Sequence, residues 1–145
     1  MEGTSERFQP ITDPKEIQHA AIRLVIAEEN RLGRGPARDT RPIRGAPADV
    51  ESRGRIIEVK AFGRFAELRT EGTLLFTPPQ LLVGAENAAY FVYVVENVAQ
   101  GDASKFEIRV LHGDNLRRLF AGARPQRSYV TVHVADYLKM PRLDE

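Results

Sequence analysis

The stretch "ADVESRGRIIEVK", residues 48–60, predicts a β-hairpin that carries charged side chains on a buried strand. Residues 53–54, Arg-Gly, form the tight turn between its two strands. The second strand, "RIIEVK", is apolar enough to be buried, yet it contains Glu58 and Lys60. Side chains two residues apart leave a strand on the same face, so these two point the same way. Asp49 ends the preceding strand, and the hairpin therefore gathers two carboxylates and an amine.

Two carboxylates that converge on one point repel each other unless a cation lies between them. Mg²⁺, or Mn²⁺ in its place, is a hard ion that takes a few carboxylate oxygens and keeps several waters. A lysine beside such an ion can orient a water or stabilise developing negative charge. Asp49, Glu58 and Lys60 thus predict a site for phosphodiester hydrolysis. The alternative is a charged strand at a sheet edge, where Glu58 and Lys60 simply pair.

Four sequence blocks around the hairpin carry a resemblance to a known family. They are "AIRLVIAEENRLGRGPARDT", "ADVESRGRIIEVKAFG", "LLFTPPQ" and "AAYFVYVVENV". Asp49 followed by Glu58-Val59-Lys60 resembles the Asp…(Glu/Asp)-x-Lys motif of the PD-(D/E)xK nuclease superfamily. The ordered blocks, over about residues 14–112, are similar to the domain at the C-terminus of the plant protein NO VEIN, which also occurs in bacterial helicase-associated and restriction-type proteins. The superfamily's proline before the aspartate is displaced here, in Pro47-Ala48-Asp49.

The resemblance implies a restriction-endonuclease-like α/β fold, with a mixed central sheet flanked by helices. By position, it implies that Asp49 and Glu58 hold the metal and that Lys60 is the catalytic lysine. It implies that Glu29 reaches the metal from the first helix. Gln80, at the start of the second helix, joins the catalytic set as a residue that organises the site or contacts DNA.

The first helix is predicted from Asp13 as N-cap to a stop at Gly33. Its broad apolar arc indicates deep packing against a sheet, and both Glu28 and Glu29 fall inside that arc. An acid on a buried helix face needs a partner. Helical phase does not choose between the two glutamates, and only the resemblance favours Glu29. The alternative is that one or both pair with the nearby Arg31 or Arg34.

An arginine-rich loop, "GRGPARDTRPIRGAP" at residues 33–47, joins the first helix to the hairpin. From residue 31 to residue 64 there are nine basic and four acidic side chains, a net charge of +5 that suits a phosphate-facing patch. The alternative is a solvated arginine-rich loop. The arginines expected to grip DNA phosphates are Arg34, Arg38, Arg41 and Arg44.

The remaining chain predicts a mixed sheet with helices on its faces. Further strands are expected at residues 73–76, 89–98, 105–111 and 128–134. A second helix is expected to begin at Thr77-Pro78-Pro79, and Asp114 is expected to cap a short third helix. A single nuclease-like domain is predicted over residues 13–145, after a disordered lead-in at residues 1–12.

Composition excludes several classes of function. No apolar run approaches the ~20 residues of a membrane span. The absence of cysteine removes thiol nucleophiles and thiolate metal sites, and it fits a cytoplasmic protein. There is no P-loop and no serine triad, and the scattered histidines, His19, His112 and His133, are predicted to lie at the surface or to be satisfied internally.

The sequence therefore predicts a Mg²⁺-dependent phosphodiesterase of the PD-(D/E)xK type, a DNA endonuclease from a defence or DNA-processing system. It contains no recognisable module that reads a DNA sequence, so a fused or associated helicase or targeting subunit is the expected second partner. One alternative is a catalytically inactive nuclease-like module that binds nucleic acid. Another is a structural domain in which the charged residues form an ion-pair network.

Overall fold

Two β-sheets and the helices around them form the structure, a computed structural model that describes residues 8–65, 73–77, 79–80, 84, 86–126 and 129–143. In chain order, the elements are α1 (Pro14–Arg31), β1 (Arg38–Asp39), β2 (Val50–Ser52), β3 (Arg55–Ala61), β4 (Thr73–Phe76), β5 (Tyr90–Glu96), the 3-10 turn η2 (Ala103–Lys105), β6 (Glu107–His112), α3 (Gly113–Ala121), β7 (Arg124–Gln126), β8 (Tyr129–His133) and α4 (Val134–Tyr137). The larger sheet has the order β1-β2-β3-β5-β6, and the smaller has the order β4-β8-β7.

Helix α1 begins and ends where its local signals predict. The Asp13 side chain accepts a hydrogen bond from the Lys15 amide at 2.9 Å, and Pro14 occupies the first turn. The chain leaves the helix at Gly33, whose φ of +80° lies in the left-handed region that glycine adopts without strain. The buried side of α1 packs on the larger sheet and forms one core with its strands.

The predicted hairpin is present as β2 and β3, which pair antiparallel with Ser52 opposite Arg55. Gly54, with φ +75°, allows the two-residue turn between them. Strand β3 also pairs in parallel with β5, the fully buried central strand. Alternation along β3 turns Ile57 and Val59 toward the core under α1, while Glu58 leaves the sheet on the opposite face.

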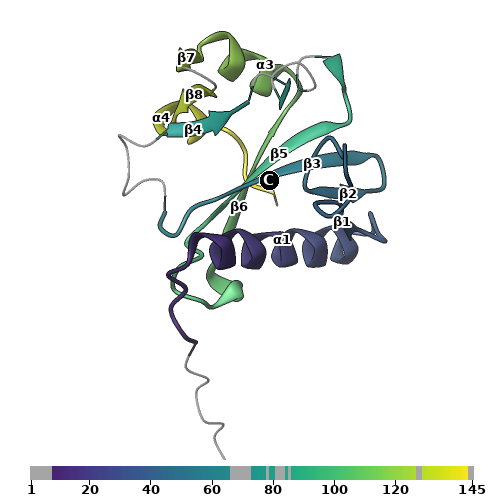
Figure 1. Ribbon diagram of the computed structural model, residues 1–145, viewed down its shortest axis with the longest axis vertical. Helices are drawn as coiled ribbons and strands as arrows, with labels where there is room; N and C mark the ends of the chain where they lie inside the picture. The colour runs from purple at the N-terminus through teal and green to yellow at the C-terminus, as the bar shows by residue number, and fades with distance from the viewer. Residues whose placement is uncertain are drawn as a thin grey trace, which may run out of the picture.

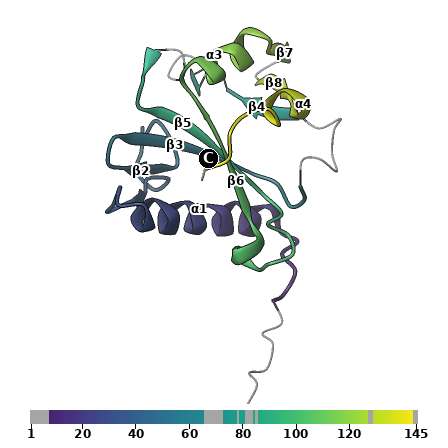
Figure 2. The same cartoon turned by 180° about the vertical axis from the view of Figure 1, so that it is seen from behind.

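The smaller sheet lies across that opposite face. Figures 1 and 2 show α1 on one side of the larger sheet and β4, β8, α3 and α4 on the other. The strands predicted at 73–76 and 128–134 both exist, as β4 and β8, but they pair with each other, and β8 also pairs with the unpredicted β7. The coarse prediction, a mixed α/β fold with a central mixed sheet flanked by helices, is confirmed.

Three local predictions need correction or completion. The short helix α3 has His112 as its N-cap residue with no side-chain cap bond, whereas Asp114 pairs with Arg117 inside the helix. Residues 8–12 of the predicted lead-in include Ile11, whose amide donates to the Ala99 carbonyl at 2.7 Å; residues 1–7 lie outside the described part of the chain. Among the described residues, no helix has the length and apolarity needed to cross a membrane.

Candidate functional site

The hairpin brings the carboxyl groups of Asp49 and Glu58 face to face. Since Val50 pairs with Ile57, the next positions outward on the two strands are Asp49 and Glu58. Asp49 is fixed by its backbone N–H, which donates to the Ile57 carbonyl at 3.1 Å, and by its Oδ2, which accepts from the Val59 amide at 2.9 Å. The backbone of β3 therefore holds the Asp49 carboxylate against Glu58.

Electrostatics distinguishes these two acids from ordinary surface carboxylates. Burial raises the pKa of Asp49, and burial together with the negative charge of Asp49 raises the pKa of Glu58 to about 7. Hydrogen bonding between the two groups lowers the Asp49 pKa and raises that of Glu58, so Glu58 is the one that holds the proton. Near neutral pH, this proton can be removed by a base or displaced into solvent by a cation.

Lys60 brings a cation to the same place from the same strand. Its Nζ lies 3.6 Å from Glu58 Oε2 and donates to Gln80 Oε1 at 3.4 Å. The ammonium also lies 4.7 Å from the centroid of the Phe76 ring. This lysine is held among three polar or aromatic groups and is mostly withdrawn from solvent.

Gln80 is held at the site by a capping box at the start of the predicted second helix. Its Oε1 accepts from the Thr77 amide at 2.9 Å, and its own amide donates to Thr77 Oγ1 at 3.4 Å. Helical backbone is present at Pro79 and Gln80. Pro78 lies outside the described residues. The structure thus brings together four of the predicted residues: Asp49, Glu58, Lys60 and Gln80.

Two hollows meet at the carboxylate pair, since Asp49 and Glu58 line both. One, of about 590 Å³, lies between the loop that includes Arg41 and the capping box of Gln80. The other, of about 340 Å³, extends past Lys60 toward the exposed side chain of Leu75. The pair is therefore open to a ligand from two sides, although each carboxyl is largely buried.

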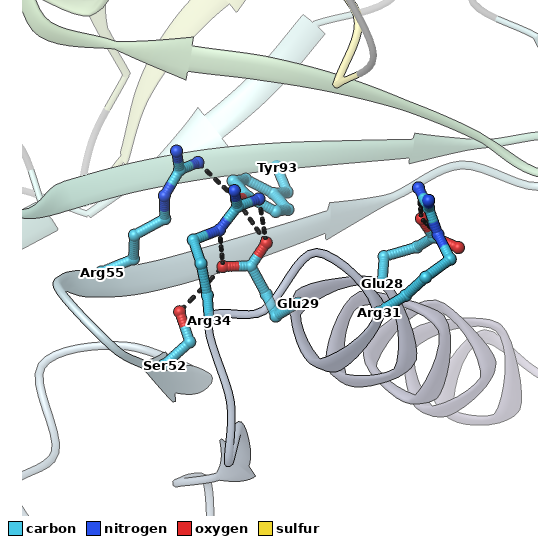
Figure 3. A network of polar contacts seen from close by, with 7 residues as sticks. All are labelled: Glu28, Glu29, Arg31, Arg34, Ser52, Arg55 and Tyr93. Carbon is cyan, nitrogen blue, oxygen red and sulfur yellow. Dashed lines mark hydrogen bonds and ion pairs between the residues drawn. The ribbon is translucent and has the colours of Figure 1, made fainter.

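Glu29 lies elsewhere, on the α1 face of the larger sheet, where its side chain is fully buried. Arg34 binds both of its oxygens, with Nε to Oε1 at 2.8 Å and Nη2 to Oε2 at 2.7 Å. Ser52 donates to Oε1 at 2.8 Å and Tyr93 donates to Oε2 at 2.9 Å (Figure 3). Burial raises the pKa of Glu29, but these hydrogen bonds outweigh it and hold the pKa below the usual value. The structure does not bring Glu29 to the Asp49–Glu58 pair.

The end of helix α1 explains this pairing. The Arg34 amide donates to the Glu29 carbonyl at 2.9 Å, and the Gly33 amide donates to the Asn30 carbonyl at 3.2 Å. These two bonds form a Schellman motif, which folds the residue after the glycine back onto the last turn of the helix. Arg34 is that residue, and its side chain meets Glu29.

Glu28, the neighbouring glutamate of α1, pairs with Arg31, as one of the alternatives from the sequence predicts. Arg31 Nη2 lies 2.6 Å from Glu28 Oε2 on the outer side of the helix. Figure 3 shows the two ion pairs apart from each other, Glu29–Arg34 next to Ser52 and Tyr93, and Glu28–Arg31 away from them along α1. Both glutamates of the apolar arc are thus matched with arginines that follow them in the sequence.

The arginines of the 33–47 loop are only partly available to a ligand. Besides the pairing of Arg34, Arg41 Nη2 lies 2.6 Å from Asp39 Oδ2, and the exposed Arg38 lies 3.5 Å from Glu51. Arg44 is exposed, and within the described ranges no hydrogen bond or ion pair involves it. Three of the four predicted arginines are therefore paired with carboxylates, one from the loop itself (Asp39), one from α1 (Glu29) and one from β2 (Glu51).

Three side chains that contribute to these two networks were not singled out from the sequence: Gln18, Ser52 and Tyr93. Gln18 Nε2 donates to the Val59 carbonyl at 3.0 Å, so α1 is fixed to β3 beside the carboxylate pair. Ser52 and Tyr93 bind Glu29. Of these three, Tyr93 gives a signal in the sequence, because its hydroxyl lies in the middle of the mainly apolar strand β5.

Within the described ranges, no group of three or more His, Cys, Asp or Glu side chains gathers to hold a metal ion. The candidate centre is thus a pair of carboxylates with a lysine and a glutamine. Comparisons with protein-family models, with curated proteins and with solved structures find nothing that matches this chain. The resemblance to PD-(D/E)xK nucleases stays a prediction from the sequence, and the functional argument rests on the site itself.

Proposed function

We propose that this protein is a metal-dependent phosphodiesterase that acts on nucleic acid, with DNA as its substrate. One observation carries the proposal: two facing carboxylates with raised pKa values, one of them 3.6 Å from a lysine amine, lie where two hollows meet. Burying like charges together costs stability, so such a pair is better explained by a ligand than by folding alone.

The donor set at this pair fits Mg²⁺ or Mn²⁺. Asp49 and Glu58 offer hard oxygen ligands, and both hollows leave room for the waters that Mg²⁺ keeps. A cation between the carboxylates would remove their mutual repulsion and the need for a shared proton. When bound, the metal would polarise the phosphate and lower the pKa of a bound water.

The remaining roles in catalysis and substrate binding would fall to Lys60, Gln80 and Arg41. Lys60 would orient the attacking water or stabilise the charge that develops on the phosphate oxygens, because its ammonium lies beside Glu58 without being a metal ligand. Gln80, which accepts a hydrogen bond from Lys60, would hold that ammonium in place. Arg41 lines the larger hollow and would position a phosphate of the strand, while a fused or associated helicase would supply targeting.

Three variants test the proposal: Asp49→Asn, Lys60→Ala and a control, Arg117→Ala on the exposed side of α3. Wild type should bind Mg²⁺ and cleave plasmid and linear DNA. Asp49→Asn should lose both properties yet keep or raise the stability of the metal-free protein, because carboxylate repulsion is relieved. Lys60→Ala should keep Mg²⁺ and DNA binding within a few-fold but lose about 10²-fold in cleavage, about 3 kcal/mol of barrier. Arg117→Ala should match wild type.

A second candidate, a nuclease-like module that binds nucleic acid without cutting it, is favoured by one specific observation. The described residues supply only two acidic ligands, since Glu29 is committed to Arg34. In that case Lys60→Ala would weaken DNA binding modestly and nothing else. Equal residual cleavage by wild type and Lys60→Ala would indicate a contaminating nuclease and would decide for this second candidate.

A further inference from the structure

Tyr90, the first residue of β5, has a buried hydroxyl for which the described part of the chain offers no hydrogen-bond partner. The side chain is 1% exposed and belongs to the core between the two sheets. A buried donor without an acceptor is unfavourable, and most native structures avoid it. Such a group therefore needs an explanation, either as a local defect or as a donor for something that binds.

The position of Tyr90 in the sheet directs attention to the carboxylate pair. In the parallel pairing of β3 with β5, Tyr90 lies opposite Ile56, and Glu58 is two residues further along. Tyr90 and Glu58 thus share one face as diagonal neighbours on adjacent strands, a spacing that an aromatic side chain can bridge. Ala48, which precedes Asp49, packs in the same core cluster as Tyr90.

The ring of Tyr90 has little freedom to turn toward another acceptor. A Cβ atom on Gly84 would lie only 3.3 Å from Tyr90 Cδ1, so the backbone at Gly84 packs closely on the ring. Burial raises the pKa of the Tyr90 hydroxyl, and the charges of Glu58 and Asp49 raise it further. The phenol therefore stays a proton donor and lies within the electrostatic range of both carboxylates.

We infer that Tyr90 is a positioning residue of the proposed metal site, whose hydroxyl donates to the Glu58 carboxylate when a cation binds. The inference rests on the proposed function. In the metal-free protein, Lys60 Nζ lies 3.6 Å from Glu58 Oε2, and no hydrogen bond joins Glu58 to the Tyr90 hydroxyl. A carboxylate that ligates a metal ion is usually hydrogen-bonded by a further donor, and the Tyr90 hydroxyl lies on the same face of the sheet with no partner among the described residues.

The test compares Tyr90→Phe with Tyr93→Phe, the same substitution on the same strand. Tyr93 faces the other side of the sheet, and its hydroxyl donates to Glu29 and accepts from Arg55 at 2.7 Å. Urea unfolding of the metal-free protein and Mg²⁺ titration are measured for each variant. Tyr90→Phe should leave metal-free stability equal or higher and weaken Mg²⁺ binding about tenfold or more. Tyr93→Phe should lower stability and leave Mg²⁺ affinity unchanged.

The cleavage rate as a function of Mg²⁺ concentration gives a second measure. A positioning role should raise the Mg²⁺ concentration for half-maximal rate more than it lowers the maximal rate. Unchanged Mg²⁺ affinity in Tyr90→Phe, with wild type binding normally, would overturn the inference. So would a loss of metal-free stability, because it would reveal a structural hydrogen bond. If wild type itself fails to bind Mg²⁺, the proposed function fails first, and the two failures are thereby distinguished.

Discussion

Replacing Glu29 with Gln should separate a structural carboxylate from a metal ligand. Glu29 is fully buried and accepts four hydrogen bonds, two of them from the Arg34 guanidinium. Glutamine keeps the shape but removes the charge, and its amide group turns a donor toward other donors. Breaking a buried ion pair in this way costs about 3–5 kcal/mol, since the remaining charge is left uncompensated.

Glu28→Gln is the matched control, one residue earlier on the same helix. Its pair with Arg31 is partly exposed, with 24% and 55% of the two side chains accessible, and it spans i to i+3. Exposed helical pairs of this kind contribute about 0.3–0.5 kcal/mol. In a chain of this size, 1 kcal/mol corresponds to about 2–4 °C in Tm, so the two variants should differ by roughly 5–20 °C.

Urea unfolding at pH 7 measures both variants, with the free energy of unfolding taken from the midpoint and slope. The difference between wild type and Glu29→Gln should also depend on pH. Because the folded-state pKa of Glu29 lies below its ordinary value of 4.5, its stabilisation is present above pH 4.5 and is lost as pH falls through the folded pKa.

One outcome would refute this reasoning. If Glu29→Gln unfolds like Glu28→Gln but binds Mg²⁺ more weakly than wild type, Glu29 is a metal ligand, as the family resemblance implies. The ion pair with Arg34 would then exchange for the metal. Unchanged Mg²⁺ affinity with a large loss of stability supports the structural role.

Two further predictions concern the proton at the carboxylate pair and the loop arginines. Because the pKa of Glu58 is raised to about 7, the stability of the metal-free protein should fall as pH rises from 4.5 to about 7, and Mg²⁺ affinity should rise over the same range. Glu58→Gln should remove both trends. A wild-type stability that does not change with pH over this range would contradict the proton on Glu58. Arg44→Gln should flatten the slope of log DNA affinity against log salt concentration by about one unit, whereas Arg38→Gln, which removes the partner of Glu51, should change it less. Equal slopes for wild type and both variants would exclude the loop from the interface.

Local signals in the sequence were sufficient for several elements. Asp13-Pro14 and Gly33 mark the ends of α1, and Gly54 marks the hairpin turn, because capping and positive φ depend on neighbours in the chain. The second sheet was not predictable in this way. Alternation identifies β8 as a half-buried strand, and the apolar run "TLLF" identifies β4, but which strand each pairs with depends on contacts distant in sequence.

The charged residues show the same limit. Counting charges over the arginine loop gives a positive patch, but the count does not show that Asp39 pairs with Arg41. Helical phase could not choose between Glu28 and Glu29, because both fall inside the apolar arc. The Schellman motif at Gly33 determines which glutamate pairs with Arg34, since it folds Arg34 onto Glu29. That signal, a glycine followed by an arginine, is readable in the sequence, but its consequence requires the geometry of the helix end.

The two buried carboxylate centres on opposite faces of the larger sheet differ in what satisfies them. Glu29 has hydrogen-bond donors on both oxygens, and its pKa is lowered. Glu58 has one amine at 3.6 Å and a second carboxyl group beside it, and its pKa is raised. A carboxylate whose oxygens already accept hydrogen bonds is not stabilised further by a cation. A pair of carboxyl groups held together by a proton is stabilised when a cation replaces that proton. The proposed metal site therefore consists of Asp49 and Glu58, and Glu29 contributes by holding α1, β2 and β5 together behind them.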